Sequence, residues 1–170
     1  MRALQTATLL ASTVGAALMA GLFCAFAYAV MPGLSRTDDR AFVRTMQQIN
    51  RAIINGWFLL PFLLPLPLLV LATVLAAKGH SPGTLPWITA ALALYLAAFV
   101  VTGTQNVPLN DALDKIPADT GPDGLRAARA AFEAGWVRWN TVRAVLHTAS
   151  LGALLWAVHL HGAAARELGA

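Results

Sequence analysis

The chain has 170 residues, of which 58% are hydrophobic and only 12% are charged, and its mean hydropathy is +0.62. Soluble domains carry about 25% charged residues, so this composition excludes an ordinary soluble domain. The length allows one domain, residues 1–170. The net charge of +4 is spread over segment ends and loops, and the absence of a basic stripe argues against nucleic-acid binding. The single cysteine, Cys24, excludes a disulfide framework.

Four apolar runs are long enough to cross the roughly 30 Å of bilayer hydrocarbon. They cover residues 6–31, 53–77, 86–105 and 139–160. The first run has a signal-peptide alternative, because Ala27-Tyr28-Ala29 resembles a cleavage site; however, it is longer than the 7–15 apolar residues typical of such peptides, so we expect a retained span. Because the bilayer core offers no water to unpaired backbone groups, every span must be helical. We therefore predict an all-α fold, a bundle of four transmembrane helices.

The second span contains Pro61, Pro65 and Pro67. Each proline removes a backbone donor and breaks helical hydrogen bonding. Such breaks are tolerated in membranes where neighbouring helices satisfy the exposed carbonyls. We predict a kinked helix that packs against its neighbours.

The distribution of Lys and Arg predicts the orientation. The two longer loops, residues 34–52 and 107–138, hold eight basic residues, and the opposite side holds three. Under the positive-inside rule, both longer loops face the cytoplasm and both termini lie outside. We expect an integral protein of the bacterial cytoplasmic membrane.

Both longer loops contain helix-start signals. Thr37-Asp38-Asp39 and Gly121-Pro122-Asp123 each place acidic residues at the first turn of a helix. The first helix is expected to merge with the second span, and the second helix with the fourth span. Helices two and four would then extend beyond the bilayer on the cytoplasmic side.

The strongest candidate site lies on the fourth span. Trp136, Asn140, Arg143 and His147 are separated by 4, 3 and 4 residues, which places them on one helix face. Arg binds anionic oxygens, His exchanges protons near neutral pH, Asn orients a ligand and Trp supplies a stacking surface. Snorkelling of Arg143 to lipid phosphate is the structural alternative. Ionisable groups inside a membrane are functional by default, so we favour a pocket here.

A second polar group ends the third span. Thr102 and Asn106 are helical neighbours, and Pro108 is expected to stop the helix at about Val107, so that Asn110 turns back on the helix end. A simple capping-and-stop signal is the alternative.

Weaker candidates occur on the first and second spans and at the ends of the fourth. Gln47, Asn50, Ile54 and Trp57 are predicted to share one helical face, and Tyr28 is a lone candidate in span one. No metal site is expected, because His159 and His161 point apart on a helix even if His80 is added as a third ligand.

Four motifs, in order along nearly the whole chain, give the sequence a family resemblance. They are Tyr28-x-x-x-Pro32-Gly33-Leu34, Gln47-x-x-Asn50, Thr102-x-x-x-Asn106-Val107-Pro108-Leu109-Asn110 and Trp136-x-x-Trp139-Asn140-x-x-Arg143. The chain resembles the anthrone-oxygenase-like family of small four-helix membrane proteins. Fungal relatives oxidise polyketide anthrones to anthraquinones, and the resemblance implies an oxidoreductase that acts with dioxygen, without metal or flavin and with no other cofactor.

The resemblance also implies roles for the candidate residues. His147 would be the base, Arg143, Asn140 and Asn106 would donate to the enolate oxygen, and Trp136 with Trp139 would form the walls of the slot. The remaining substrate-binding candidates are Thr102, Asn110, Asn50, Gln47 and Tyr28.

Two classes of function stay open. The first is oxidation of a flat aromatic or quinol-like substrate. The second is a non-enzymatic membrane protein that binds a lipid or a partner protein, since a basic cytoplasmic face attracts anionic lipid. The expected partners are an apolar small molecule or a lipid, and a homo-oligomer is left open. An inward Arg143 beside an enclosed pocket favours the first class, and an outward Arg143 favours the second.

Overall fold

A computed structural model describes residues 2–80 and 82–167, with the side chains of residues 79, 80, 82 and 165–167 left out. His80, the third metal-ligand candidate, therefore has its side chain outside the described part. Every regular element in the described residues is a helix. In chain order they are α1 (Arg2–Ala25), η1 (Phe26–Val30), α2 (Met31–Leu34), α3 (Asp39–Ala52), α4 (Gly56–Leu63), α5 (Pro65–Leu75), η2 (Ala76–His80), η3 (Pro82–Thr84), α6 (Leu85–Val101), η4 (Thr102–Asn106), α7 (Val107–Asp114) and α8 (Pro122–Glu167).

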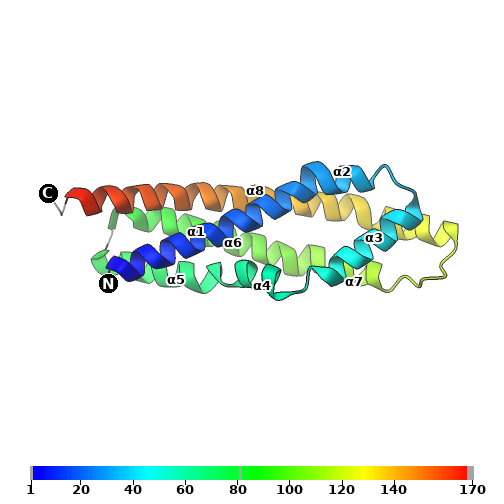
Figure 1. Cartoon of the computed structure of the whole chain (residues 1–170), viewed down its shortest axis with the longest axis horizontal. Helices are drawn as coiled ribbons and strands as arrows, with labels where there is room; N and C mark the ends of the chain where they lie inside the picture. Colours follow the sequence, from blue (N-terminus) through cyan, green and yellow to red (C-terminus); the bar gives the residue numbers. More distant parts are fainter. Residues whose placement is uncertain (1, 81, 168–170) are drawn as a thin grey trace.

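Four continuous helical stretches are long and apolar enough to cross a membrane. They are Arg2–Leu34, Gly56–Lys78, Leu85–Asp114 and Pro122–Ala164. They form an elongated bundle with both termini at one end, the terminal end, and with α2, α3, α7 and the start of α8 at the other, the loop end (Figure 1). The predicted all-α bundle of four membrane helices is confirmed, and the protein is an integral membrane protein.

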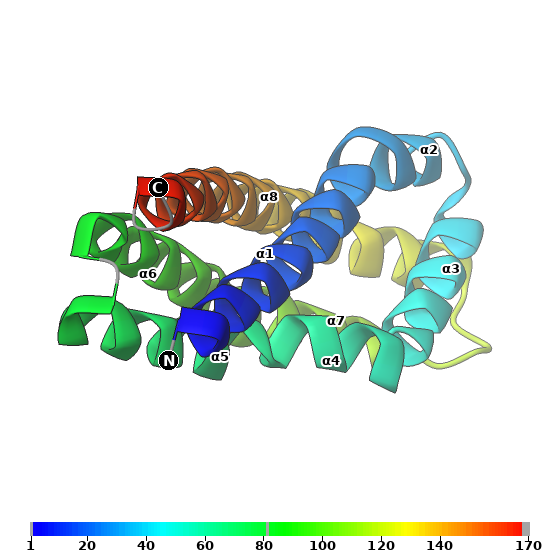
Figure 2. The same cartoon turned by 60° about the vertical axis from the view of Figure 1, so that its left-hand side comes forward.

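The fourth helix is the longest element. α8 begins at Pro122, where the sequence predicts a helix start, and continues without a break for 46 residues. At 1.5 Å per residue it is about 69 Å long, roughly twice the hydrocarbon thickness. The predicted extension of this helix beyond the bilayer is confirmed, and Figure 2 shows α1 crossing diagonally in front of α8.

The second helix does not extend in the predicted way. α3 ends at Ala52, and a break at residues 53–55 separates it from α4. Asn55 holds both ends of the break, because its amide nitrogen donates to the Ala52 carbonyl at 2.7 Å and its oxygen accepts from the Phe58 backbone N–H at 3.2 Å. The predicted merger of this helix with span two is therefore wrong, and Ile54 lies in the break rather than on a shared helical face.

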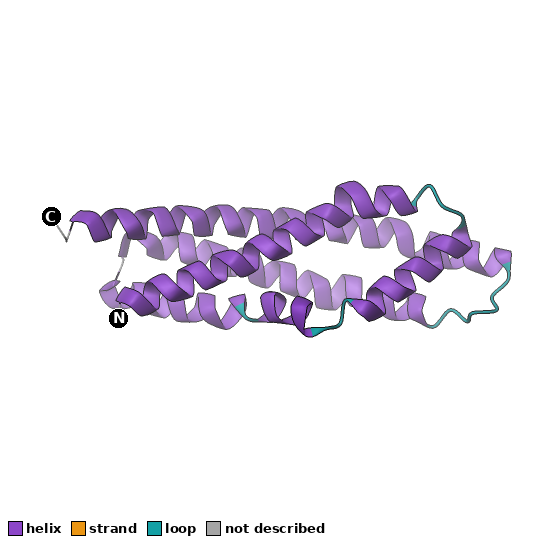
Figure 3. Cartoon of the chain, viewed as in Figure 1, coloured by secondary structure: helices purple, strands orange, loops and turns teal. Residues whose placement is uncertain are grey.

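The proline-rich second span is kinked as predicted. α4 and α5 are separated at Leu64, just before Pro65, and the break is visible in Figure 3. The Tyr95 hydroxyl of α6 lies 3.0 Å from both the Pro61 and the Phe62 carbonyl oxygens and serves as their donor. A neighbouring helix thus satisfies the carbonyls that the proline kink exposes.

Pro108 does not end the third helix. A π-helical turn, η4, precedes it, and the Val107 N–H bonds to the Thr102 carbonyl, five residues back. This shift of register places Pro108 in the first turn of α7, where a missing N–H costs little. The predicted stop near Val107 is wrong, and Asn110 lies within α7.

Two hydrophobic clusters divide the interior. The larger cluster fills the membrane part between α1, α5, α6 and α8, around side chains such as Leu69, Tyr95 and Leu154. The second joins the loop-end helices through Phe42, Phe132 and their neighbours. The candidate site lies where these two clusters meet.

Candidate functional site

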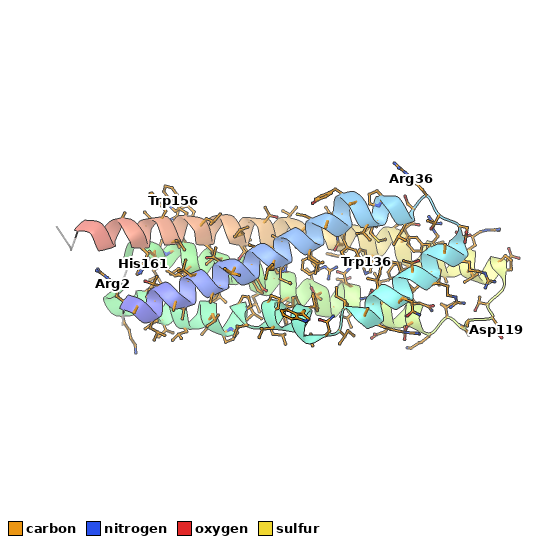
Figure 4. All side chains as sticks on the ribbon, in the orientation of Figure 1. Arg2, Arg36, Asp119, Trp136, Trp156 and His161 are labelled. Atoms are coloured by element: carbon orange, nitrogen blue, oxygen red, sulfur yellow. The ribbon has the colours of Figure 1, made fainter. Side chains whose placement is uncertain are left out.

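The polar stripe of α8 faces the inside of the bundle. Trp136 and Arg143 are 4% and 5% exposed, and Asn140 and His147 are fully buried. Figure 4 shows Trp136 among the helices of the loop half, whereas Trp156 lies on the outer surface of the terminal half. The helical spacing of the stripe places its four side chains inside the bundle, against α1, α6 and α7, rather than against lipid.

Asn140 links α8 to α1 and positions Arg143. Its amide nitrogen donates to the Phe23 carbonyl at 3.0 Å, and its oxygen accepts from Arg143 Nη2 at 3.0 Å. A backbone carbonyl and a guanidinium therefore fix both ends of one buried amide. This arrangement orients the arginine without neutralising it.

Arg143 carries a buried charge that lacks an acidic partner. Its guanidinium carbon lies 4.3 Å from the Phe23 ring centre and 5.6 Å from that of Trp136. Its Nε is buried without a hydrogen-bond acceptor, and no carboxylate in the described residues forms an ion pair with it. Aromatic faces offset part of the cost of a buried cation, but an anionic group is the partner that best stabilises it.

His147 lies deeper than Arg143 and is enclosed by rings. Its ring stacks on Phe23 with centres 5.1 Å apart and meets the edge of Tyr95 at 4.6 Å. Both ring nitrogens are buried without a partner in the described structure. His147 is not among the residues that line the cavity described next.

A cavity of about 210 Å³ adjoins Arg143 at the meeting point of α1, α3, α4, α7 and α8. Its walls are mainly apolar and aromatic. The residues that contribute the apolar walls are Leu22, Phe23, Phe26, Ile49, Ile53, Ile54, Phe58, Val107 and Trp136. The residues that contribute polar groups are Asn50, Arg51, Thr102, Asn110, Asp111, Asp114, Asn140 and Arg143. An apolar slot with a few convergent polar groups is typical of small-molecule sites.

The structure brings six of the predicted site residues to this cavity. They are Arg143, Asn140, Trp136, Thr102, Asn110 and Asn50. Asn110 accepts a 2.8 Å hydrogen bond from the Trp136 indole N–H, and the buried Asn50 amide nitrogen has no partner in the described structure. Thr102 donates to the Ala98 carbonyl at 2.9 Å.

Five predicted residues do not line the cavity. Asn106 is fully buried behind it and donates to the Trp136 carbonyl at 3.3 Å. Gln47 joins α3 to the Leu113 carbonyl at 2.8 Å, so its contacts are structural. Trp139 lies beneath the Arg138 guanidinium, 4.9 Å from the ring centre. Tyr28 is 73% exposed on the outer surface, and His147 is placed as described above.

Sequence reasoning missed several cavity residues. Phe23, Phe26 and Phe58 supply aromatic walls from apolar runs that show no distinguishing pattern. Arg51 and Asp114 form a 2.7 Å ion pair between α3 and α7, and Asp111 lies one helical turn before Asp114. The i, i+3, i+4 and i+7 spacing of Val107, Asn110, Asp111 and Asp114 was a usable signal, but it required α7 to continue beyond Pro108.

No metal centre is formed by the side chains that the structure describes. No group of three or more His, Cys, Asp or Glu residues is placed to hold an ion. His161 instead lies 2.9 Å from the Thr6 hydroxyl, which links α8 to α1 near the terminal end.

The fold and the site define a class: a four-span membrane bundle with an apolar cavity beside a buried, unpaired arginine. A model of the anthrone oxygenase family matches residues 53–153, which is more than half of the chain. The protein belongs to the anthrone oxygenase family, as its motifs predict. The matched range contains the whole α8 stripe and the Thr102–Asn110 segment, but not Tyr28, Gln47 or Asn50. Neither the curated proteins nor the solved structures gave a match.

Proposed function

We propose that the protein oxidises a flat, apolar aromatic substrate of the anthrone or quinol type, dissolved in the membrane, with dioxygen as oxidant. The buried guanidinium of Arg143 on the cavity wall carries the proposal, because it lacks a carboxylate in the described chain. An aromatic ligand with an anionic oxygen supplies that missing partner. In the orientation that the Lys and Arg distribution favours, the cavity lies near the cytoplasmic surface.

The chemistry of an anthrone fits such a cavity. Its methylene C–H, opposite the ring carbonyl, is acidic, and loss of the proton gives an electron-rich enolate. The enolate reacts with dioxygen directly, so the proposal requires neither metal nor flavin. Overall, two C–H bonds at the methylene carbon are replaced by one carbonyl. One oxygen atom of O₂ enters the quinone and the other leaves as water, which balances the four electrons lost by carbon.

The residues of the cavity support separate parts of this chemistry. Arg143, held by Asn140, donates N–H groups to the enolate oxygen, whose negative charge grows as the proton leaves. Phe23, Phe26 and Trp136 form a slot that accepts flat rings. The apolar rings around the buried guanidinium lower the local dielectric and strengthen its interaction with the enolate.

The alternative of lipid-headgroup binding is less well supported. A headgroup-binding arginine turns outward to the membrane surface, whereas Arg143 is 5% exposed and stacked between two aromatic rings. The cavity of about 210 Å³ beside it suits a compact aromatic molecule better than a phosphodiester with two long chains.

Oxygen uptake by the purified protein tests the proposal. With an anthrone as substrate, wild-type protein is expected to consume one O₂ per anthraquinone formed, well above the rate in protein-free micelles. Arg143→Met is expected to lower the excess uptake about 100-fold by removing the donor, and Asn106→Leu is expected to lower it by removing the hydrogen bond that joins η4 to α8 beside the cavity. Wild-type oxygen uptake equal to that of protein-free micelles would refute the proposal. Uptake by Arg143→Met equal to that of wild type would refute it as well.

A further inference from the structure

One wall of the cavity is a single face of α7. Val107, Asn110, Asp111 and Asp114 all line the cavity, and their i, i+3, i+4 and i+7 spacing places them on one side of a helix. The face therefore presents two carboxylates to a cavity that the Arg143 guanidinium also lines. Enolate formation needs these two elements: a group that takes a proton from carbon and a group that holds the developing anion.

The two carboxylates differ in their partners. Asp114 forms a 2.7 Å ion pair with Arg51, which holds it as part of the contact between α3 and α7. Asp111 forms no ion pair within the described residues. The remaining polar groups on the cavity wall are amides, a hydroxyl and two guanidiniums, which do not accept protons near neutral pH.

Two hydrogen bonds to Trp136 hold α7 and the preceding turn η4 against α8 beside the cavity. The Trp136 indole donates to Asn110 of α7 at 2.8 Å, and Asn106, the last residue of η4, donates to the Trp136 carbonyl at 3.3 Å. Together they tie the first turn of α7, which carries Asp111 directly after Asn110, to α8. Asp111 is thus placed by rigid helices rather than by a loop, as a base that must meet a particular C–H bond requires.

We propose that Asp111 is the general base that removes the acidic proton of the substrate. This inference rests on the proposed function of the cavity. In the step, the C–H bond breaks and its electron pair passes into the ring system. The proton moves to the Asp111 carboxylate, while Arg143 binds the oxygen that becomes anionic. Asp111 is solvent-exposed, so it returns the proton to water, and His147 is left without a direct role in proton transfer.

Anaerobic isotope exchange isolates this step from oxidation. An anthrone deuterated at the methylene carbon is incubated with purified protein in ordinary water without oxygen, and the loss of deuterium is followed by NMR. Wild-type protein is expected to accelerate the loss above the micelle blank. Asp111→Asn should reduce the acceleration at least 100-fold, within the range typical of general bases. Asp111→Glu, which keeps the carboxylate, should restore at least a tenth of it.

Asp119→Asn is the matched control, because it makes the same chemical change in the exposed loop before α8, away from the cavity (Figure 4). It should exchange at the wild-type rate. Exchange that persists in Asp111→Asn, or that is lost in Asp114→Asn but not in Asp111→Asn, would overturn the assignment. If wild-type protein still consumes oxygen faster than protein-free micelles, such a result contradicts the role of Asp111 but not the proposed function. Wild-type uptake equal to that of protein-free micelles would contradict the proposed function itself.

Discussion

Two arginines on α8 differ in the partners that surround their charge: Arg129 pairs with carboxylates, and Arg143 pairs with none in the described residues. Arg129, at the loop end, donates to Glu133 at 2.7 Å and Asp39 at 3.2 Å, and to the Thr37 and Ser35 carbonyls at 2.9 and 2.8 Å. Arg143 donates to a neutral amide and otherwise contacts aromatic rings. Both also lie over a phenylalanine, Phe42 in the case of Arg129.

The difference between these regions separates structure from function. Around Arg129, charges and carbonyls satisfy one another and join α3, the loop before it and α8 into one unit. Around Arg143, a buried cation has no carboxylate partner among the described residues, and an isolated buried charge costs several kcal/mol. A protein retains such a cost where a ligand completes the site. Under the proposed function, Arg129 serves stability and Arg143 serves ligand binding.

The sharpest test of this division is Arg143→Met. We expect kcat/KM for an anthrone to fall about 100-fold, the typical loss on removal of one donor to an oxyanion. The thermal stability in detergent should stay equal or rise, because the substitution removes an unpaired buried charge. The division would fail if this variant lost stability and activity in parallel.

The converse test is Arg129→Met. The substitution removes the ion pair with Glu133 and leaves Asp39, among the described residues, with only the 4.0 Å contact to Arg126. We therefore expect a loss of about 2 kcal/mol in unfolding free energy, discounted for partial exposure of the carboxylates. Oxygen uptake per folded molecule should stay within about twofold of wild type, since Arg129 lies outside the cavity. Thermal denaturation followed by circular dichroism, together with the uptake assay, measures both. A folded but inactive variant would contradict the division.

A smaller effect is expected from Tyr95→Phe. The hydroxyl is the donor to the Pro61 and Phe62 carbonyls at the kink of span two. Its loss should cost about 1 kcal/mol, because hydrogen bonds between membrane helices contribute roughly 0.6–2 kcal/mol. Thermal unfolding in the same detergent provides the measurement. Unchanged stability would indicate that the kink does not depend on α6.

The sequence alone predicts the four spans and one face of the candidate site. Apolar run length predicts the four spans, and α8 follows from Pro122 and the helical spacing after it. The 4, 3, 4 spacing predicts that Trp136, Asn140, Arg143 and His147 share a face, because a helix repeats its side chains every 3.6 residues. Local rules of this kind need no knowledge of neighbouring helices.

The errors arise where the local rule was overridden by its surroundings. Pro108 is a helix breaker unless a π-helical turn shifts the hydrogen-bond register before it, and nothing in the local pattern predicts η4. The break before α4 depends on Asn55, which satisfies both helix ends with one side chain. The aromatic walls and Asp111 depend on which faces of α1, α4 and α7 meet, and helix faces in a largely apolar chain carry little contrast.

A pair of ligands of matched shape tests the central claim that the Arg143 cavity binds an aromatic anion. Anthracene-9-carboxylate and 9-methylanthracene are close in size and differ in charge, and their binding to detergent-solubilised protein can be followed by ligand fluorescence. For each protein, the affinity for the carboxylate is divided by the affinity for the methyl compound, with the same correction for micelle binding. This ratio is predicted to be at least tenfold higher in wild-type protein than in Arg143→Met. An equal preference in the two proteins would contradict the account.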